Sequence, residues 1–189
     1  GFFRDVIDPD RIGMSGHSFG GLTSFLVGCI DPRIKVIVPM TPVTSVVPIM
    51  ACKLEEFPSP VMMMTGGLDN TLDVENEMRK GFAKLTGERH YFELKAGGHF
   101  TYSDICLLDL ELVADALDIP TGGALNDGCG EDNVPIPVAH PLIRQFSIGF
   151  LNHHLRDSPG SAKWYDAAAA AASSDLLIYE TYPGPAPAR

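Results

Sequence analysis

Three residue types that together make a nucleophilic catalyst follow one another along this chain, each in a glycine-rich segment. Ser18 lies within the segment GHSFG, Asp69 within TGGLD and His99 within AGGHF. A serine hydroxyl attacks a carbonyl group efficiently only when a base removes its proton and a carboxylate orients that base. The three residues therefore predict acyl transfer with Ser18 as the nucleophile, His99 as the general base and Asp69 as the orienting acid.

The GHSFG segment matches the G-x-S-x-G pattern of a nucleophile elbow, a sharp turn between a strand and a helix. We expect Ser18 to occupy a strained turn in which Gly16 and Gly20 crowd together, so that neither can carry a side chain. The backbone N–H of Phe19 is then expected to be one donor to the oxyanion of the tetrahedral intermediate. The alternative is an ordinary Ser/Gly turn, but the predicted strand before it and helix after it favour the elbow.

The acid and the base each have competitors. Asp69 could instead cap the helix that begins near Asp73, itself a candidate cap. His99 is favoured as the base because it alone follows a predicted strand within a Gly-Gly turn, whereas the side chain of His17 is expected to point away from Ser18. The remaining histidines lie at a strand start or on the long C-terminal helix region, at His90, His140, His153 and His154.

The elements that must position these residues follow from hydrophobic periodicity. Apolar or alternating runs predict strands at residues 11–15, 34–39, 60–65 and 89–94, and helical spacing predicts helices at 20–29, 73–85, 107–117 and 142–155. Strands that alternate with helices predict a mainly parallel sheet covered on both faces, a three-layer α/β/α fold. The carboxyl ends of parallel strands meet at one edge of such a sheet, so the three motif loops are expected to converge there.

These motifs resemble those of the α/β-hydrolase superfamily, within it the dienelactone-hydrolase-like esterases that include platelet-activating-factor acetylhydrolases, lipases and polyester hydrolases. The resemblance rests on the segments GHSFGG, TGGLDNTL, GGHF and FLNHHLRD and covers roughly residues 8 to 157. His17 before the serine looks most like the acetylhydrolase and lipase branches, since polyester hydrolases usually carry Trp or Tyr there. The resemblance implies hydrolysis of a carboxylic ester, lipid or polyester included, through an acyl-enzyme and without a cofactor.

Two other classes stay open, because a peptidase or thioesterase uses the same triad and a catalytically silent binding module can share the fold. His17 and Phe100, which flank the proposed nucleophile and base, are expected to contact substrate.

The resemblance changes the interpretation of the chain length of 189 residues. An α/β-hydrolase places its nucleophile after the fifth of eight strands, with about 100 or more residues before it, whereas here the nucleophile is already residue 18. We therefore expect residues 1–166 to be the C-terminal catalytic portion of one domain and 167–189 an Ala- and Pro-rich tail. A separate N-terminal segment, from cleavage or from another chain, is expected to pair with the exposed strand and to supply the second oxyanion donor.

Composition excludes two classes of partner. The formal net charge is −10 and no cluster of basic residues occurs, so nothing favours binding to nucleic acid or to an anionic membrane surface. No apolar run approaches the ~20 residues needed to span a bilayer. No signal peptide is recognisable at the first residues.

The four cysteines show neither a C-x-x-C pair nor zinc-ligand spacing, and the acidic segment NDGCGEDN lacks the alternating carboxylates of a calcium loop, so no metal site is expected. They fit two disulfides or four buried thiols. We favour a bond between Cys106 and Cys129, with Cys29 and Cys52 as the other candidates, and hence an oxidising compartment: a secreted or periplasmic protein. Residues 101–137 then form either a flap over the substrate or a stapled surface excursion.

Overall fold

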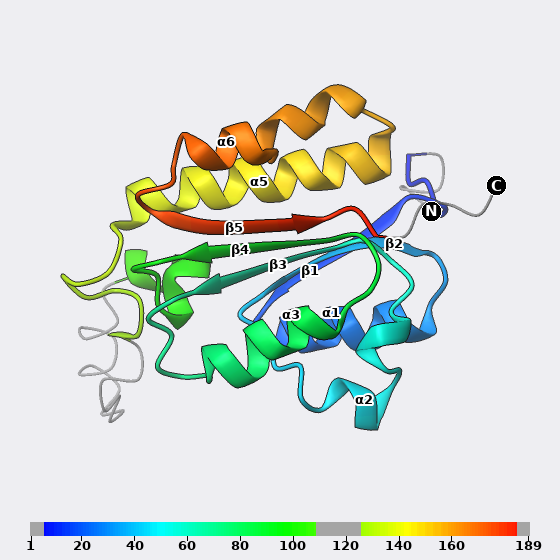
Figure 1. Cartoon of the computed structure of the whole chain (residues 1–189), viewed down its shortest axis with the longest axis horizontal. Helices are drawn as coiled ribbons and strands as arrows, with labels where there is room; N and C mark the ends of the chain where they lie inside the picture. Colours follow the sequence, from blue (N-terminus) through cyan, green and yellow to red (C-terminus); the bar gives the residue numbers. More distant parts are fainter. Residues whose placement is uncertain (1–5, 109–125, 185–189) are drawn as a thin grey trace.

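A single mixed sheet organises the chain. The computed structural model describes residues 6–108 and 126–184 (Figure 1). Its five strands lie in the order β1-β2-β3-β4-β5, the first four parallel and the last antiparallel to its neighbour. Their bounds are β1 Ile12–His17, β2 Ile34–Met40, β3 Val61–Gly66, β4 Arg89–Leu94 and β5 Leu177–Tyr182. The predicted α/β class and the mainly parallel sheet are confirmed.

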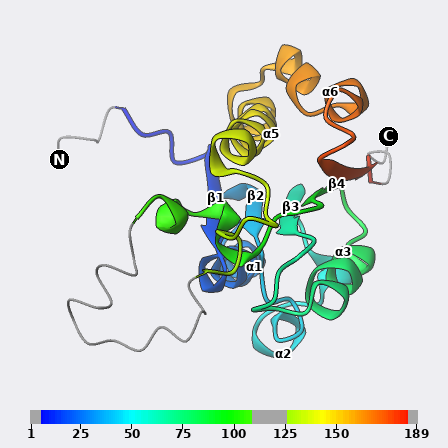
Figure 2. The ribbon, with the colours of Figure 1, turned by 90° about the vertical axis from the view of Figure 1, so that its left-hand side faces the viewer.

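Helices cover both faces of this sheet. Seen from the side, α5 and α6 lie on one face and α1, α2 and α3 on the other, which gives three layers (Figures 1 and 2). Within the described residues, the α-helices are α1 Phe19–Ile30, α2 Val47–Met50, α3 Lys80–Lys84, α5 Ile136–Arg156 and α6 Ala167–Ala171. The shorter helical turns there are the 3₁₀-helices η1 Leu54–Glu56, η3 His99–Tyr102, η4 Asp104–Leu107 and η6 Pro159–Trp164, and the π-helical turn η2 Val74–Arg79.

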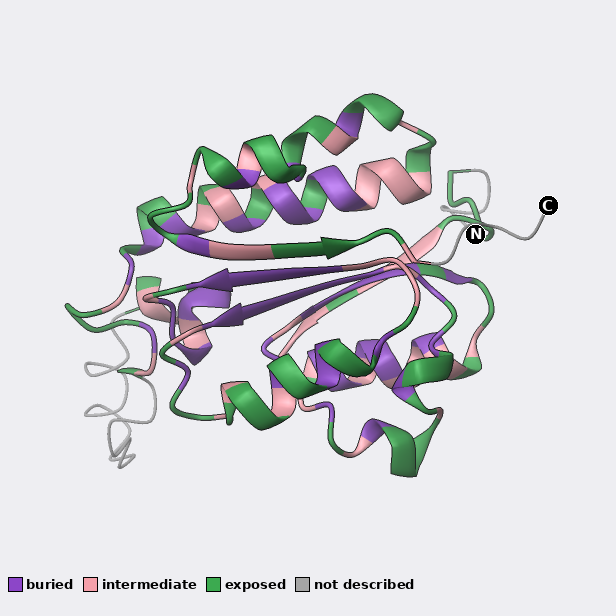
Figure 3. Cartoon of the chain, in the orientation of Figure 1, coloured by how far each residue is buried: buried purple, intermediate pink, exposed green. Residues whose placement is uncertain are grey.

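Two apolar cores flank the sheet, and β3 contributes to both. Met62 and Met64 pack toward α5, whereas Met63 faces the opposite side together with Phe25 of α1. All three methionines are fully buried, and β3 and β4 are the most completely buried strands (Figure 3). A continuous apolar run is what a parallel strand covered on both faces requires.

The structure departs from the predicted elements in the C-terminal half. Helix α5 begins six residues before the predicted start at 142: Pro137 lies in its first turn, where a proline costs no hydrogen bond, and the helix continues through Pro141. Most of the predicted helix at 107–117 falls outside the described residues, and its first residue closes the 3₁₀-helix η4 instead. The tail was not predicted to hold regular structure, yet α6 and β5 lie within it.

Strand β1 forms one edge of the sheet. Among the described residues it pairs with β2 alone, and most of its residues are partly exposed. The N-terminal partner segment expected for this edge is not shown by the structure and stays a prediction, as does the domain boundary near residue 166.

Two disulfides join the four cysteines. The bond between Cys106 and Cys129 confirms the favoured pairing, and the second bond joins Cys29 at the end of α1 to Cys52 after α2. Each bond spans 23 residues of sequence. They differ in their surroundings, since Cys29 and Cys52 pack against the apolar core beneath α1, whereas neither apolar core includes Cys106 or Cys129.

Candidate active site

Ser18 lies on a strained turn between β1 and α1. Its φ of 56° and ψ of −115° lie in a region that residues with a side chain rarely adopt. The Ser18 N–H donates to the carbonyl of Met40 (2.9 Å), which fixes the turn against β2. A Cβ on Gly16 would collide with the backbone of Gly20, whereas a Cβ on Gly20 would meet open space. The two glycines therefore crowd together as predicted, and Gly16 cannot carry a side chain, but the prediction that Gly20 cannot carry one is wrong.

The residue before the serine contacts the histidine turn. Nε2 of His17 lies 2.8 Å from the carbonyl oxygen of His99, and because a carbonyl only accepts, this nitrogen carries the proton. The His17 ring centroid is 4.7 Å from that of His99 and 5.9 Å from that of Phe100. Burial lowers the pKa of His17, which keeps the ring neutral near pH 7. The predicted substrate contacts of His17 and Phe100 stay predictions.

Asp69 and His99 form a buried pair. Oδ2 of Asp69 lies 2.8 Å from Nδ1 of His99, and the two side chains are almost completely shielded from solvent. The other carboxylate oxygen accepts from the backbone N–H groups of Thr71 (2.9 Å) and Leu72 (2.8 Å). With its Nδ1 proton donated to the carboxylate, the imidazole keeps a free lone pair on Nε2, the form a general base needs.

The cap of the following helical turn is formed by another residue. Oδ1 of Asp73 accepts from the N–H of Asn76 (3.0 Å) at the start of η2. The competing role considered for Asp69 is thus occupied by Asp73, and Asp69 turns toward the histidine instead.

The loops after β3 and β4 lie too close together for a side chain at Gly66. A Cβ on Gly66 would collide with the carbonyl group of Gly97, and the N–H of Leu68 donates to that same carbonyl (2.8 Å). The loops after β3 and β4 therefore pack backbone against backbone, which brings Asp69 within reach of His99.

Ser18 and His99 are linked through the His17 contact, but in the described part of the chain the Ser18 hydroxyl makes no hydrogen bond to His99. Such contacts are often long before substrate binds. The Phe19 N–H lies in the first turn of α1, where N–H groups have no acceptor within the helix. Ser18 itself accepts from Gly21 and Leu22 through its carbonyl.

Comparison with protein families adds an independent finding. The profile of the family "Platelet-activating factor acetylhydrolase, isoform II" matches residues 2–171, a range that includes Ser18, Asp69 and His99. The chain belongs to this family. The acetylhydrolase family lies within the α/β-hydrolase superfamily and acts on esters, so the expected resemblance is confirmed and ester hydrolysis is the class of activity that membership indicates. A comparison with curated proteins yields no match.

Asp127 also lies beside the loops of Asp69 and His99, but the sequence did not single it out. Asp127, in the loop before α5, accepts from the N–H of His99 (3.0 Å) and from the N–H of Asn70 (2.9 Å). Its only local signal is the Asp-Gly pair, which marks a turn. Its partners lie too far away in sequence for a local pattern to reveal them.

The remaining histidines lie elsewhere. His90 is the second residue of β4, with Nδ1 2.7 Å from the hydroxyl of Tyr179 and Nε2 3.3 Å from Glu88. His154 lies 3.2 Å from the same carboxylate and His153 bonds to Tyr165. His140 lies 3.8 Å from Asp104.

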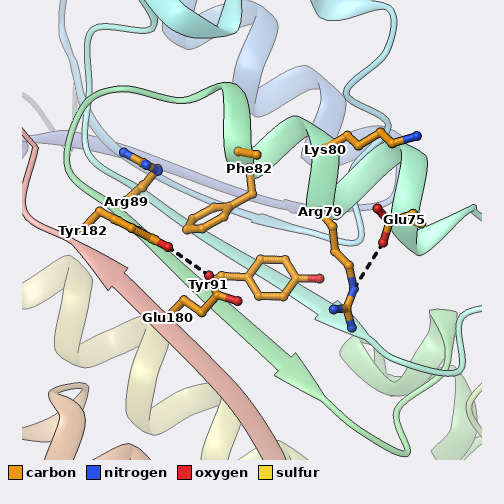
Figure 4. A pocket seen from close by; sticks show the side chains of 9 residues that line it. Glu75, Arg79, Lys80, Phe82, Arg89, Tyr91, Glu180 and Tyr182 are labelled. Atoms are coloured by element: carbon orange, nitrogen blue, oxygen red, sulfur yellow. Dashed lines mark hydrogen bonds and ion pairs between the residues drawn. The ribbon is translucent and has the colours of Figure 1, made fainter.

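A pocket of about 450 Å³ lies beside the sheet between η2, α3 and the strands β4 and β5 (Figure 4). None of the three motif residues lines it. Arg79 bonds both carboxylate oxygens of the buried Glu93, which also accepts from the hydroxyl of Tyr91 (2.7 Å). Burial raises the pKa of Tyr91, so that hydroxyl remains a donor. These groups satisfy one another and support the strand that precedes the His99 turn.

Within residues 6–108 and 126–184, no group of three or more histidine, cysteine, aspartate or glutamate side chains is arranged to hold a metal ion. No helix in this part of the chain is long and apolar enough to cross a membrane.

Proposed function

We propose that Ser18, His99 and Asp69 form a catalytic triad that hydrolyses carboxylic esters through an acyl-enzyme. The observation that carries the proposal is the buried 2.8 Å bond between Asp69 and His99, held against a strained serine turn by the 2.8 Å bond from His17. The match to a family of ester hydrolases supports it.

In this mechanism Nε2 of His99 takes the proton from the Ser18 hydroxyl as Oγ attacks the ester carbonyl. Asp69 keeps the imidazole in the required tautomer and stabilises the imidazolium that forms. The tetrahedral intermediate then collapses, the bond to the alcohol breaks, and His99 donates its proton to the leaving oxygen. A water molecule repeats both steps on the acyl-enzyme and restores Ser18.

The oxyanion is stabilised by the N–H of Phe19, a contribution of about 3 kcal/mol if it is typical of such donors. The second donor is proposed to come from a segment outside this chain that pairs with the edge strand β1. The edge position of β1 supports this proposal, because Ser18 follows directly from that strand.

The substrate is proposed to be an ester with a short acyl group, as the acetyl ester in the family's name suggests. Phe19 and Leu68 are exposed, at 75% and 44%, and adjoin the nucleophile and the acid in sequence. They offer an apolar surface for the remainder of a lipid or polyester substrate. The two disulfides favour an oxidising compartment, so a secreted or periplasmic location is proposed.

The proposal is tested by hydrolysis of p-nitrophenyl acetate, butyrate and octanoate beside a peptide p-nitroanilide. We expect the acetate to be cleaved with the highest kcat/KM and Ser18→Ala to lower it by about 10³-fold or more. Ser174→Ala, which changes an exposed serine between α6 and β5, is the matched control and keeps the parent rate. Parent-like hydrolysis by Ser18→Ala would disprove the triad, and preferential cleavage of the anilide would indicate a peptidase.

A further inference from the structure

We propose that Asp127 is a positioning residue for the triad: its carboxylate ties the loop of the acid to the turn of the base, and the Cys106–Cys129 disulfide anchors it. The inference rests on the proposed function of Ser18, Asp69 and His99. We call residues 126–134 the strap, because they lie across the His99 turn.

On the acid side, the strap holds the residues that follow Asp69. Oδ2 of Asp127 accepts from the N–H of Asn70 (2.9 Å) and from the hydroxyl of Thr71 (2.7 Å). Thr71 also donates its own N–H to Asp69 (2.9 Å). One threonine thus links the two carboxylates, and a displacement of Asp127 passes directly to the acid.

On the base side, the strap fixes the peptide of the histidine. Oδ1 of Asp127 accepts from the N–H of His99 (3.0 Å), and the Asp127 carbonyl accepts from the N–H of Phe100 (2.7 Å). The carbonyl of His99 is already bonded to His17. The backbone of the base is therefore held from both sides, one side by the elbow and the other by the strap.

The strap fits the turn without space for side chains. A Cβ on Gly98 would collide with the backbone of Gly128, which itself has a φ of +103°. The hydroxyl of Thr101 accepts from Gly98 N–H (2.9 Å) and donates to the Gly128 carbonyl (3.3 Å). Further along, the N–H of Val134 donates to the carbonyl of Ala96 (2.8 Å), just before the turn.

The disulfide joins the strap to the segment that follows the turn. Cys129 lies two residues after Asp127, and Cys106 lies in η4, directly after η3, which begins at His99. The bond therefore ties the strap to the turn that follows the element of His99. Cys29–Cys52 spans the same number of residues but packs against the apolar core, so it serves as a matched control.

The chemistry of Asp127 predicts a graded response to substitution. A carboxylate accepts from three donors at once, and such charge-assisted bonds are stronger than neutral ones. An asparagine keeps one oxygen for the N–H of His99, but its amide group then meets the N–H of Asn70 as a second donor. Asp127→Asn should retain part of the function that Asp127→Ala loses.

The first experiment measures kcat and KM with p-nitrophenyl acetate. We expect Asp127→Ala to lower kcat by about 10- to 100-fold, as displacement of a catalytic group by ~1 Å does, with KM changed less than about twofold. Asp127→Asn should lie between this variant and the parent. Asp132→Ala, at an exposed acidic residue of the same strap, is the control and should match the parent. Unchanged kcat in folded Asp127→Ala overturns the proposal, and Asp127→Asn decides it if the alanine variant does not fold.

The second experiment compares the disulfides. The double variant that carries Cys106→Ser and Cys129→Ser should have a lower kcat. The double variant that carries Cys29→Ser and Cys52→Ser should have a lower Tm but an unchanged kcat at temperatures where the protein is folded. Equal losses of kcat in the two double variants would contradict the anchor role.

A third readout does not depend on catalysis. The His99 Nδ1 proton, bonded to Asp69, should give a downfield proton NMR signal that is absent from Asp69→Ala. We expect this signal to be lost or shifted in Asp127→Ala and retained in Asp132→Ala; an unchanged signal in Asp127→Ala would overturn the positioning role. If the parent protein shows the signal but hydrolyses no ester, the proposed function fails while the test of the strap stands.

Discussion

Strand β4 has a histidine–carboxylate cluster at each end. Beyond its last residue, His99 bonds Asp69 at 2.8 Å. At its first residues, His90 and His154 lie 3.3 and 3.2 Å from the carboxylate of Glu88. The same functional groups at similar distances thus occupy both ends of one strand, and only their surroundings differ.

The surroundings separate the two clusters. At the carboxyl end, the histidine turn meets the Ser18 elbow through His17 and the strap through Asp127. At the amino end, His90 packs against the rings of Phe150 and Tyr165, and Tyr179 bonds its Nδ1. A histidine and a carboxylate alone therefore do not indicate catalysis. The proposed catalytic role of the cluster at the carboxyl end rests also on Ser18 beside it and on the sheet edge where it lies.

Of the substitutions that test the contrast between the two clusters, we expect the largest effect at the carboxyl end of β4. Asp69→Asn should lower kcat by about 10³- to 10⁴-fold, because the amide favours the wrong tautomer of His99. The variant should remain folded, since the amide preserves the shape of the side chain. Steady-state ester hydrolysis measures the effect, and a loss below about tenfold would mean that Asp69 does not orient the base.

The corresponding change at the amino end should affect stability and not activity. Glu88→Gln removes the charge that two histidines share, at an expected cost of about 1–3 kcal/mol in the free energy of unfolding. Urea denaturation measures this change, and kcat should equal that of the parent. A fall in kcat comparable with that of Asp69→Asn would erase the distinction between the two ends.

The smallest effect concerns pH. Burial of Glu88 opposes its ionisation, but the imidazoles of His154 and His90, 3.2 and 3.3 Å from its carboxylate, outweigh it and lower the pKa of Glu88 from 4.5 to about 2. A lowered carboxyl pKa gives stability that is present above the unfolded value and is lost as the pH falls toward the folded value. The free energy of unfolding should therefore decline between about pH 4.5 and pH 2.

In Glu88→Gln this part of the decline should be absent, while Glu131→Gln, at an exposed glutamate of the strap, should behave as the parent. Identical pH curves for the parent and Glu88→Gln would show that the Glu88 cluster does not contribute to acid stability.

The sequence predicts Ser18, Asp69 and His99 better than it predicts the residues that hold them in place. The predicted bounds of the strand at 89–94 agree with β4, and those of the other predicted strands agree closely, because burial on both faces leaves a direct trace in apolar runs. Ser18, Asp69 and His99 could be proposed because each follows such a run in a glycine-rich loop.

Features that depend on distant partners could not be predicted in this way. Asp127 bonds residues 28 and 57 positions away, and no local pattern records such contacts. Strand β5 exists through its pairing with β4, from Arg89 with Tyr182 to Leu94 with Leu177, far apart in sequence. The long helix begins six residues before the predicted start, with Pro137 in its first turn, where a proline is tolerated, and Pro141 inside the helix.

The central claim is that Ser18 is an activated nucleophile, and a fluorophosphonate probe tests it most directly, because such a probe reacts covalently with serines that a neighbouring base activates. The labelled protein is digested and the modified peptide is identified by mass spectrometry, with heat-denatured protein as the control. We predict a single label on Ser18 in the folded parent, none in the denatured protein or in Ser18→Ala, and much slower labelling in Asp69→Asn. A folded parent that stays unlabelled, or a label on another serine, would contradict the account.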